Sequence, residues 1–317
     1  MEKSASMDKV AAPPVKQVRV RAPATSANLG AGFDCLGLAL ELYMDLAVEE
    51  GAGEGLEIAA TGEGSGSVPL DERNAVYQGM MCAYARVGKK PRRLRLTIDS
   101  QIPLASGLGS SSAALVAGLT AGAELCGMGL DREEILRQGM AVEGHPDNVA
   151  PCALGGIVIA ALDGEKVAWA RIEPPRDLAA VVAIPDFSLP TSKSRSVLPE
   201  RVERRDAIFN AGRVGLLVAA LQQGDYSLLR IGMQDRLHQP YRTTLVPGME
   251  AVLGAATEAG ALGAALSGAG PTALALVSGR GTEVADAMQK AWAKEGIAAR
   301  TLVLGLAAEG VQCVKER

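Results

Sequence analysis

The chain has 317 residues, a length that suits two domains better than one, and its 32 lysines and arginines nearly balance 36 aspartates and glutamates. A net charge of −4 argues against nucleic acid as the main partner, although a local basic pocket for a small anion is compatible with it. Five scattered cysteines, two histidines and the lack of a long apolar run exclude a histidine-rich metal site and predict a cytoplasmic protein that does not contact a membrane.

Residues 1–16 mix charges with paired prolines and show no periodicity, which predicts a disordered N-terminal extension. Alternation then predicts a strand at 16–22, and the glycines and short polar residues of 23–34 predict a turn-rich loop. Hairpin turn chemistry and ligand binding explain that loop about equally well. Further along, residues 55–64 and 93–98 are expected strands with a helix between them.

The stretch around which the chain is organised is the central loop, residues 103–114, where a strand gives way to glycines and serines and then to an apolar helix. Gly107 and Gly109 permit backbone angles closed to other residues, and the three serines that follow lie where a helix leaves its amide donors unpaired. Such donors favour phosphate. The loop matches neither the Walker nor the dinucleotide pattern, and a plain strand-to-helix turn with a serine cap is the competing interpretation.

Asp131 is expected to cap a second helix, and the polar cluster Glu143–Pro151 predicts a site loop because its composition suits neither helix nor strand. Two strands and a domain boundary near 174–177 follow. A strand at 178–186 and a basic polar loop at 190–199 open the second half. The remaining expected elements are helices at about 201–222, 225–238 and 248–259, two strands joined by the third loop (267–272), a helix at 282–296 and a strand at 299–306. This mixture predicts two α+β domains.

Three loops in this order, 23–34, 103–114 and 267–272, resemble those of the GHMP small-molecule kinases. The motif PATSANLG-x-GFD together with HPDNVAP is most similar to the homoserine kinase branch, because the mevalonate and galactose branches carry a lysine or arginine in the first motif. The resemblance extends from about Val18 to the end. It implies a two-domain GHMP kinase fold: an ATP-binding N-terminal domain like the second domain of ribosomal protein S5 (17–174) and a ferredoxin-like C-terminal domain (175–317).

The activity implied by this resemblance is the phosphorylation of the side-chain hydroxyl of L-homoserine by ATP, with Mg²⁺, a step toward threonine. A homodimer is also expected. In the family the central loop surrounds the ATP phosphates, and an asparagine in the preceding helix approaches the adenine. The nucleotide-binding residues carried over are therefore Asn74, Pro103, Leu104, Ala105, Ser106, Gly107, Leu108, Gly109, Ser110, Ser111, Ser112 and Ala113.

For magnesium the resemblance nominates Ser111 and Glu143, with Ser110 or Ser112 as alternatives to Ser111. Magnesium prefers oxygen ligands and keeps several waters, so one or two protein ligands suffice.

Homoserine is a zwitterion that carries a carboxylate, an ammonium and a hydroxyl. Arginine suits a carboxylate because its guanidinium binds bidentately. The residues that the resemblance assigns to the substrate are Arg195 and Arg242 for the carboxylate, Asp34 and Asn28 for the ammonium, Gly268 in the third loop, and His145, Asp147 and Asn148 at the reacting end.

Two mechanisms remain open. Asp147 accepts the hydroxyl proton in one, although the lysine that pairs with the matching aspartate in related kinases is missing here. In the other, which we favour, the proton passes to the γ-phosphate and Asn148 orients the hydroxyl, because a loose transition state needs positioning more than a base. Two rival functions are a sister kinase for another small alcohol, which would lack the paired arginines, and a non-catalytic sensor, which would lack the phosphate and magnesium residues.

Overall fold

The first sheet of the computed structural model is built around a long hairpin formed by β1 (Lys16–Asn28) and β2 (Gly32–Gly51). The predicted loop at 23–34 is wrong, because the two strands stay paired as far as Asn28 and Gly32. Thr25 and Ser26 are fully buried within β1, so their polar side chains face the interior rather than a surface turn. The tight turn that remains begins at Asn28, whose φ of 71° is rare outside glycine.

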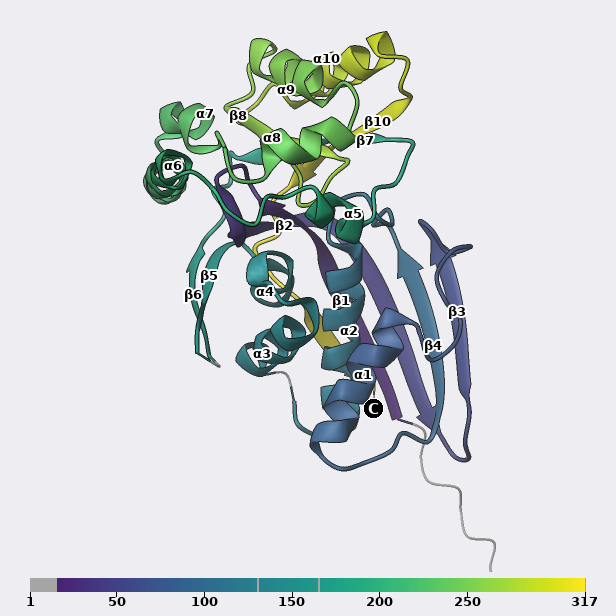
Figure 1. Ribbon diagram of the computed structural model, residues 1–317. Coiled ribbons are helices and arrows are strands. Elements are labelled where there is room, and N and C mark those ends of the chain that lie inside the picture. Colours follow the sequence, from purple (N-terminus) through teal and green to yellow (C-terminus); the bar gives the residue numbers. More distant parts are fainter. Residues whose placement is uncertain (1–15, 130, 165, 317) are drawn as a thin grey trace, which may run out of the picture.

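Seven strands form this sheet. Five follow the order β11-β1-β2-β4-β3, while β5 pairs with β2 and β6 pairs with β5. All neighbours are antiparallel except β3 and β4. The further strands are β3 (Leu56–Gly62), β4 (Arg93–Ser100), β5 (Ile157–Asp163), β6 (Lys166–Ile172) and β11 (Gln312–Glu316). One face is covered by α1 (Ala75–Arg86), α2 (Ser110–Leu125), α3 (Arg132–Glu143) and α4 (Pro146–Leu154) (Figure 1). The helices α2 and α4 lie directly on the sheet, while α1 packs on α2 and α3 on α4.

A second sheet has the antiparallel order β10-β7-β9-β8, which is the ferredoxin-like arrangement expected for the C-terminal domain. Its strands are β7 (Ala179–Pro185), β8 (Gly263–Leu266), β9 (Ala273–Val277) and β10 (Ala299–Gly305). Because side chains alternate along a strand, Val181 and Ala275 face α9 (Met249–Glu258) and α10 (Gly281–Lys294), while Val182 and Leu274 join the core of the first sheet. The two sheets therefore share a hydrophobic core.

Besides α9, a series of helices connects β7 to the rest of the second sheet, and all of them except the 20-residue α6 are short. They are α5 (Thr191–Ser196), α6 (Arg204–Gln223), η1 (Tyr226–Leu228), α7 (Leu229–Gly232), α8 (Gln239–Arg242) and η2 (Thr243–Leu245). The single helix predicted at 225–238 is wrong, because α7 ends at Gly232 and the buried carboxylate of Asp235 instead accepts the backbone N–H groups of Leu237, His238 and Gln239.

Two segments predicted as loops contain helices. Residues 143–151 include the start of α4, where Pro146 occupies the first helical position, which needs no N–H donor. The expected loop at 190–199 contains α5. Local composition misled the prediction in both segments, because proline and short polar residues are also what a helix N-terminus favours.

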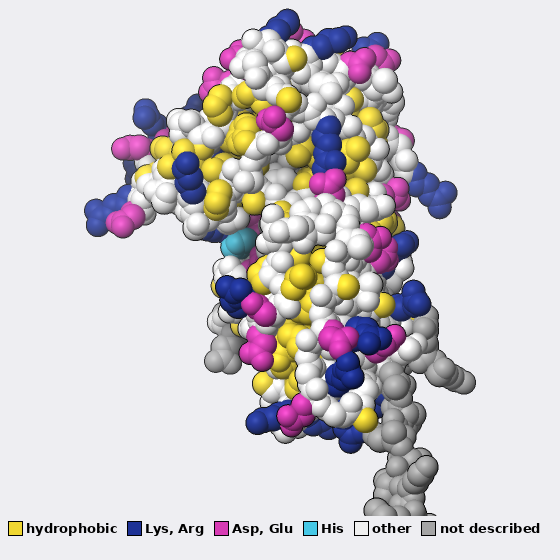
Figure 2. All heavy atoms as spheres, turned by 90° about the vertical axis from the view of Figure 1, so that its right-hand side faces the viewer, with side chains coloured by type: hydrophobic (Ala, Val, Ile, Leu, Met, Phe, Trp, Pro, Cys, Tyr) yellow, Lys and Arg dark blue, Asp and Glu magenta, His cyan; other side chains and the backbone are white. Residues whose placement is uncertain are grey.

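The structure describes residues 16–129, 131–164 and 166–316. The predicted disordered extension therefore lies outside the described residues, except Lys16, which begins β1. The chain returns to the first sheet at its far end, since β11 pairs with β1. No helix in the described ranges is long and apolar enough to cross a bilayer. Acidic and basic side chains are interspersed on the face shown in Figure 2.

Candidate active site

Three glycine-rich segments that are far apart in the sequence meet where the two sheets join. Buried Ser267 in the third loop lies 2.8 Å from the hydroxyl of Ser26 in β1 and donates a 2.7 Å hydrogen bond to the carbonyl of Gly107 in the central loop. A backbone hydrogen bond of 3.1 Å from the Thr25 amide to the Leu108 carbonyl strengthens the junction. The structure thus brings together the three motifs that the sequence analysis singled out.

Glycine is required at the point where the central loop enters α2. Gly109 has φ of 70°, and a Cβ there would lie 2.0 Å from Thr25 Oγ1. Gly109 is also the N-cap residue of α2 and provides no capping side chain, so the competing interpretation of a turn with a serine cap is wrong. The first-turn amides of α2 therefore stay available to an anion.

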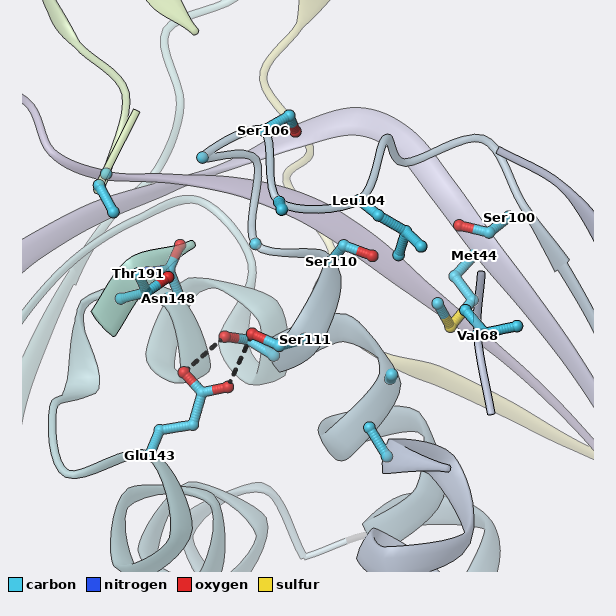
Figure 3. Close-up of a pocket in the computed structure, with 18 of the residues that line it drawn as sticks. Met44, Val68, Ser100, Leu104, Ser106, Ser110, Ser111, Glu143, Asn148 and Thr191 are labelled. Carbon is cyan, nitrogen blue, oxygen red and sulfur yellow. Dashed lines mark hydrogen bonds between the residues drawn. The ribbon is translucent and has the colours of Figure 1, made fainter. Parts of the chain in front are cut away.

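A cavity of about 640 Å³ opens in front of α2 and is lined by residues of both domains. Met44, Val68 and Leu104 lie at one end, which is largely apolar apart from Ser100, while Ser111 and Glu143 lie at the other end (Figure 3). This size suits a nucleotide and a small substrate.

Most of the predicted nucleotide residues line this cavity. Three members of the central loop do not, because Pro103, Leu108 and Ala113 are buried in the protein interior. Asn74 lines the cavity, but its side chain accepts from the Val76 amide and donates to the Pro69 carbonyl, so its polar atoms cap α1.

Glu143, the last residue of α3, reaches the start of α2. Its two oxygens accept hydrogen bonds from Ser111 (3.2 Å) and Ser112 (2.9 Å) (Figure 3). Burial raises the pKa of Glu143 by more than these hydroxyls and His145 lower it, so the carboxylate lacks enough positive charge nearby to offset its burial. An oxygen-only set with surplus negative charge is the kind of site that a hard divalent cation prefers.

The N-terminus of α4 presents three polar side chains to the same cavity. His145 Nδ1 lies 2.5 Å from Asp147 Oδ1, and the Asn148 amide donates to the same oxygen at 3.4 Å. Asn148 Oδ1 accepts a 2.8 Å hydrogen bond from Thr25, which fixes the amide orientation. Although burial lowers the pKa of His145, the bond and charge of Asp147 outweigh burial and raise it overall.

Opposite α4, the start of β2 and helix α5 form an ion pair. Arg195 donates two hydrogen bonds, of 3.1 and 2.7 Å, to the two oxygens of Asp34. Asn28 accepts from the Asp34 amide and donates to the Gly268 carbonyl at 2.9 Å, so its side chain is engaged by the backbone. Asp34, which was predicted to bind the substrate ammonium, and Arg195, which was predicted to bind the substrate carboxylate, therefore contact each other in this structure.

Arg242 is the other predicted arginine, and only 2% of it is exposed. It donates to the carbonyls of Gly268 (3.1 Å) and Ser194 (3.4 Å) and to His238 Nδ1 (3.2 Å), which are all neutral acceptors. Burial first, and then the charge of Arg195, lower the pKa of Arg242 from 12.5 to about 10. A buried cation held by neutral groups is a receptor for an anion.

Comparison with known proteins decides the family. Residues 74–156 match the family described as GHMP kinases N terminal domain, and residues 217–294 match GHMP kinases C terminal. A homoserine kinase of Moorella thermoacetica is 48% identical over 278 residues, which cover 88% of this chain and 93% of that protein. The chain belongs to the homoserine kinase family. The resemblance drawn from the three motifs is thereby confirmed.

Solved structures agree with this family and its two-domain fold. The crystal structure of homoserine kinase from Cytophaga hutchinsonii superposes with a TM-score of 0.85 at 30% identity, covering 99% of this chain and 100% of that one. Mevalonate kinase of L. major, in complex with R-mevalonate, has a TM-score of 0.67 at 18% identity over 94% of this chain and 98% of its own. That second likeness shows the shared fold alone.

Several residues of this homoserine kinase family member escaped the sequence analysis. His238 stacks on Phe33 with ring centroids 5.0 Å apart, donates from Nε2 to the Gly30 carbonyl and supports Arg242 through Nδ1. Burial lowers the pKa of His238, which keeps the ring neutral and able to accept. Its position four residues before Arg242 in HQPYR was the only available signal. Ser267 had no signal beyond its membership of the third loop.

Proposed function

We propose that this chain is a homoserine kinase, which transfers the γ-phosphoryl group of ATP to the side-chain hydroxyl of L-homoserine. The observation that carries the proposal is a single cavity with a phosphate-binding helix terminus at one wall and a cluster of arginines and carboxylates at the other. The family relationship supports the same activity. The product is O-phospho-L-homoserine, and the step belongs to threonine biosynthesis.

ATP enters with its base toward the apolar end lined by Met44, Val68 and Leu104, and its phosphates toward the first turn of α2. Hydrogen bonds from backbone amides and the helix dipole stabilise the phosphate charge.

Ser111 and Glu143 would hold Mg²⁺, since both offer oxygen ligands and lie within 3.2 Å of each other. Ser112 keeps the second oxygen of Glu143 in place. Bound magnesium would neutralise negative charge on the transferred phosphoryl group.

Arg242 and Arg195 bind the substrate carboxylate, and Asp34 and Asn28 bind the ammonium. The hydroxyl then points toward α4. Asn148, fixed by Thr25, orients that hydroxyl toward the γ-phosphate. Positioning of this kind supplies most of the catalysis when the transition state is loose, and the proton passes to the phosphoryl oxygens.

The experiment that tests this function is an ADP-release assay with ATP, Mg²⁺ and four alcohols: L-homoserine, L-serine, L-threonine and mevalonate. We expect turnover of L-homoserine well above the other three. Preferred turnover of mevalonate, or no turnover at all, would refute the assignment.

Three further expectations stay proposals. The five cysteines are all free thiols, which supports a reducing compartment such as the cytoplasm. A homodimer follows from the family resemblance and is testable by sedimentation. The interspersed surface charges in Figure 2 support a protein that does not bind nucleic acid.

A further inference from the structure

The strand β6 forms one border of the first sheet. Among the described residues its one strand neighbour is β5, with which it forms the hairpin at the left of Figure 1, beside α3 and α4. In an antiparallel pair, alternate residues direct their backbone N–H and C=O groups away from the neighbour. The outer side of β6 can therefore accept a strand from another chain.

The other sheet edges are short or charged, as edges usually are in proteins that avoid such pairing. The strands β8 and β11 have four and five residues. On β3, Glu57 accepts a 3.0 Å hydrogen bond from Arg95, and on β10, Arg300 donates a 2.6 Å hydrogen bond to Glu63.

The β6 edge lacks these protections over most of its length. Its seven residues pair with β5 without a register shift, so no bulge turns the edge away from a partner. Trp169 is 39% exposed, and Leu162, which lies opposite Val167, is 61% exposed. Because side chains alternate along a strand, these three residues share one face of the hairpin. The result is an exposed apolar patch next to an unpaired edge.

The charges at the two ends of β6 indicate which partner fits this edge. Lys166 begins the strand, and Glu173 directly follows its end with a side chain that is 68% exposed. When two copies of β6 lie antiparallel, Lys166 of each copy lies near Glu173 of the other, whereas an in-register parallel pair brings like charges together. A two-fold axis produces the antiparallel arrangement. The strand is therefore complementary to itself.

We infer that β6 is a homodimer contact, in which it pairs antiparallel with β6 of a second copy and joins the two first sheets into one. Trp169 lies near the middle of the segment 166–173, so the two copies of this side chain lie close to the two-fold axis and lose exposure. The inference goes beyond the homodimer proposed above by placing its contact surface. It is independent of the kinase activity.

Tryptophan fluorescence reports directly on this surface. The chain has two tryptophans, and the other one, Trp292, is fully buried. Dilution from about 100 to 0.1 μM, a range that spans weak and stable dimers, should shift the emission to longer wavelength as sedimentation velocity shows dimers becoming monomers. Trp169→Phe should still sediment as a dimer at high concentration but should lose the emission shift.

Charge reversal tests the antiparallel pairing. Lys166→Glu creates two like-charged pairs across the axis and should raise the dimer dissociation constant by about 10- to 100-fold. The double variant Lys166→Glu with Glu173→Lys restores opposite charges and should return the constant to within about threefold of the unaltered chain. Lys290→Glu, an exposed residue of α10, is the matched control and should leave the constant unchanged. Circular dichroism checks that each variant is folded.

Three outcomes overturn the inference. The first is a monomer throughout the concentration range. The second is a dimer whose emission does not change on dilution, because such a dimer uses another surface. The third is a double variant that dimerises as weakly as Lys166→Glu, since the two charges then do not meet across the contact. A chain that dimerises as expected but releases no ADP with homoserine would refute the proposed function and leave this contact in place.

Discussion

Substitution of Gly109 by alanine tests whether the junction of the central loop with β1 controls both stability and catalysis. The residue has φ of 70°, and the new Cβ would lie 2.0 Å from Thr25 Oγ1. The left-handed conformation costs about 1–2 kcal/mol in a residue with a side chain. The overlap adds about 1–3 kcal/mol, since the buried Thr25 must move. Gly109→Ala should therefore lose about 2–5 kcal/mol of unfolding free energy.

Gly127 provides the matched control. Its φ is 80°, and a Cβ there meets nothing within 4 Å. Gly127→Ala should thus lose only the free energy of the left-handed backbone conformation, about 1–2 kcal/mol of unfolding free energy measured in urea. The same Gly109→Ala change should lower kcat by about 100-fold, because a displaced Thr25 releases the Asn148 amide.

The double variant Gly109→Ala with Thr25→Ala removes the overlapping hydroxyl. We expect it to recover about 1–3 kcal/mol relative to the sum of the single variants, a coupling measurable by a double-mutant cycle. Activity should stay low, because Asn148 still lacks its donor. Equal stability losses in Gly109→Ala and Gly127→Ala, or additive single and double variants, would refute the reasoning.

Glu143→Gln should raise the Mg²⁺ concentration for half-maximal activity by at least about 10-fold in a magnesium titration at fixed ATP, since a charged ligand is lost; an unchanged titration would exclude Glu143 as a ligand. Arg242→Lys keeps the positive charge but loses the bidentate donors of the guanidinium. KM for homoserine should therefore rise about 10- to 100-fold while KM for ATP stays the same. A parallel rise of the two KM values would contradict this role of Arg242. Because the raised pKa of His145 lies above 6.5, its ion pair with Asp147 stabilises the fold below pH 6.5 and is lost as the pH rises through that pKa. The urea unfolding midpoint should therefore differ less between about pH 5.5 and pH 8.5 in His145→Gln than in the unaltered chain.

The order of elements was largely readable from the sequence, because most strands and helices have clear periodicity and clear ends. Asp131, for example, caps α3 as expected and accepts from the Glu134 amide. The central loop was recognisable because glycine and serine have few alternative uses before an apolar helix.

The errors came from residues whose role depends on distant contacts. Thr25 and Ser26 suggest a turn locally, yet tertiary pairing holds them in a strand where they bind Asn148 and Ser267. Arg242 would ordinarily be assigned to the surface, and its burial results from His238 and the third loop. The partners of Thr25 and Ser26 lie more than a hundred residues away, and no local pattern encodes contacts of that range.

The pairing of β11 with β1 bears on how the protein is made. Val18 lies opposite Lys315, so the first strand completes its ladder only after residues 312–316 have been synthesised. Until then one edge of the first sheet offers unpaired backbone groups to other chains. Contacts of such long range also slow folding. The first sheet should therefore be completed after the second sheet has been synthesised, and the protein should aggregate when expressed without residues 312–316.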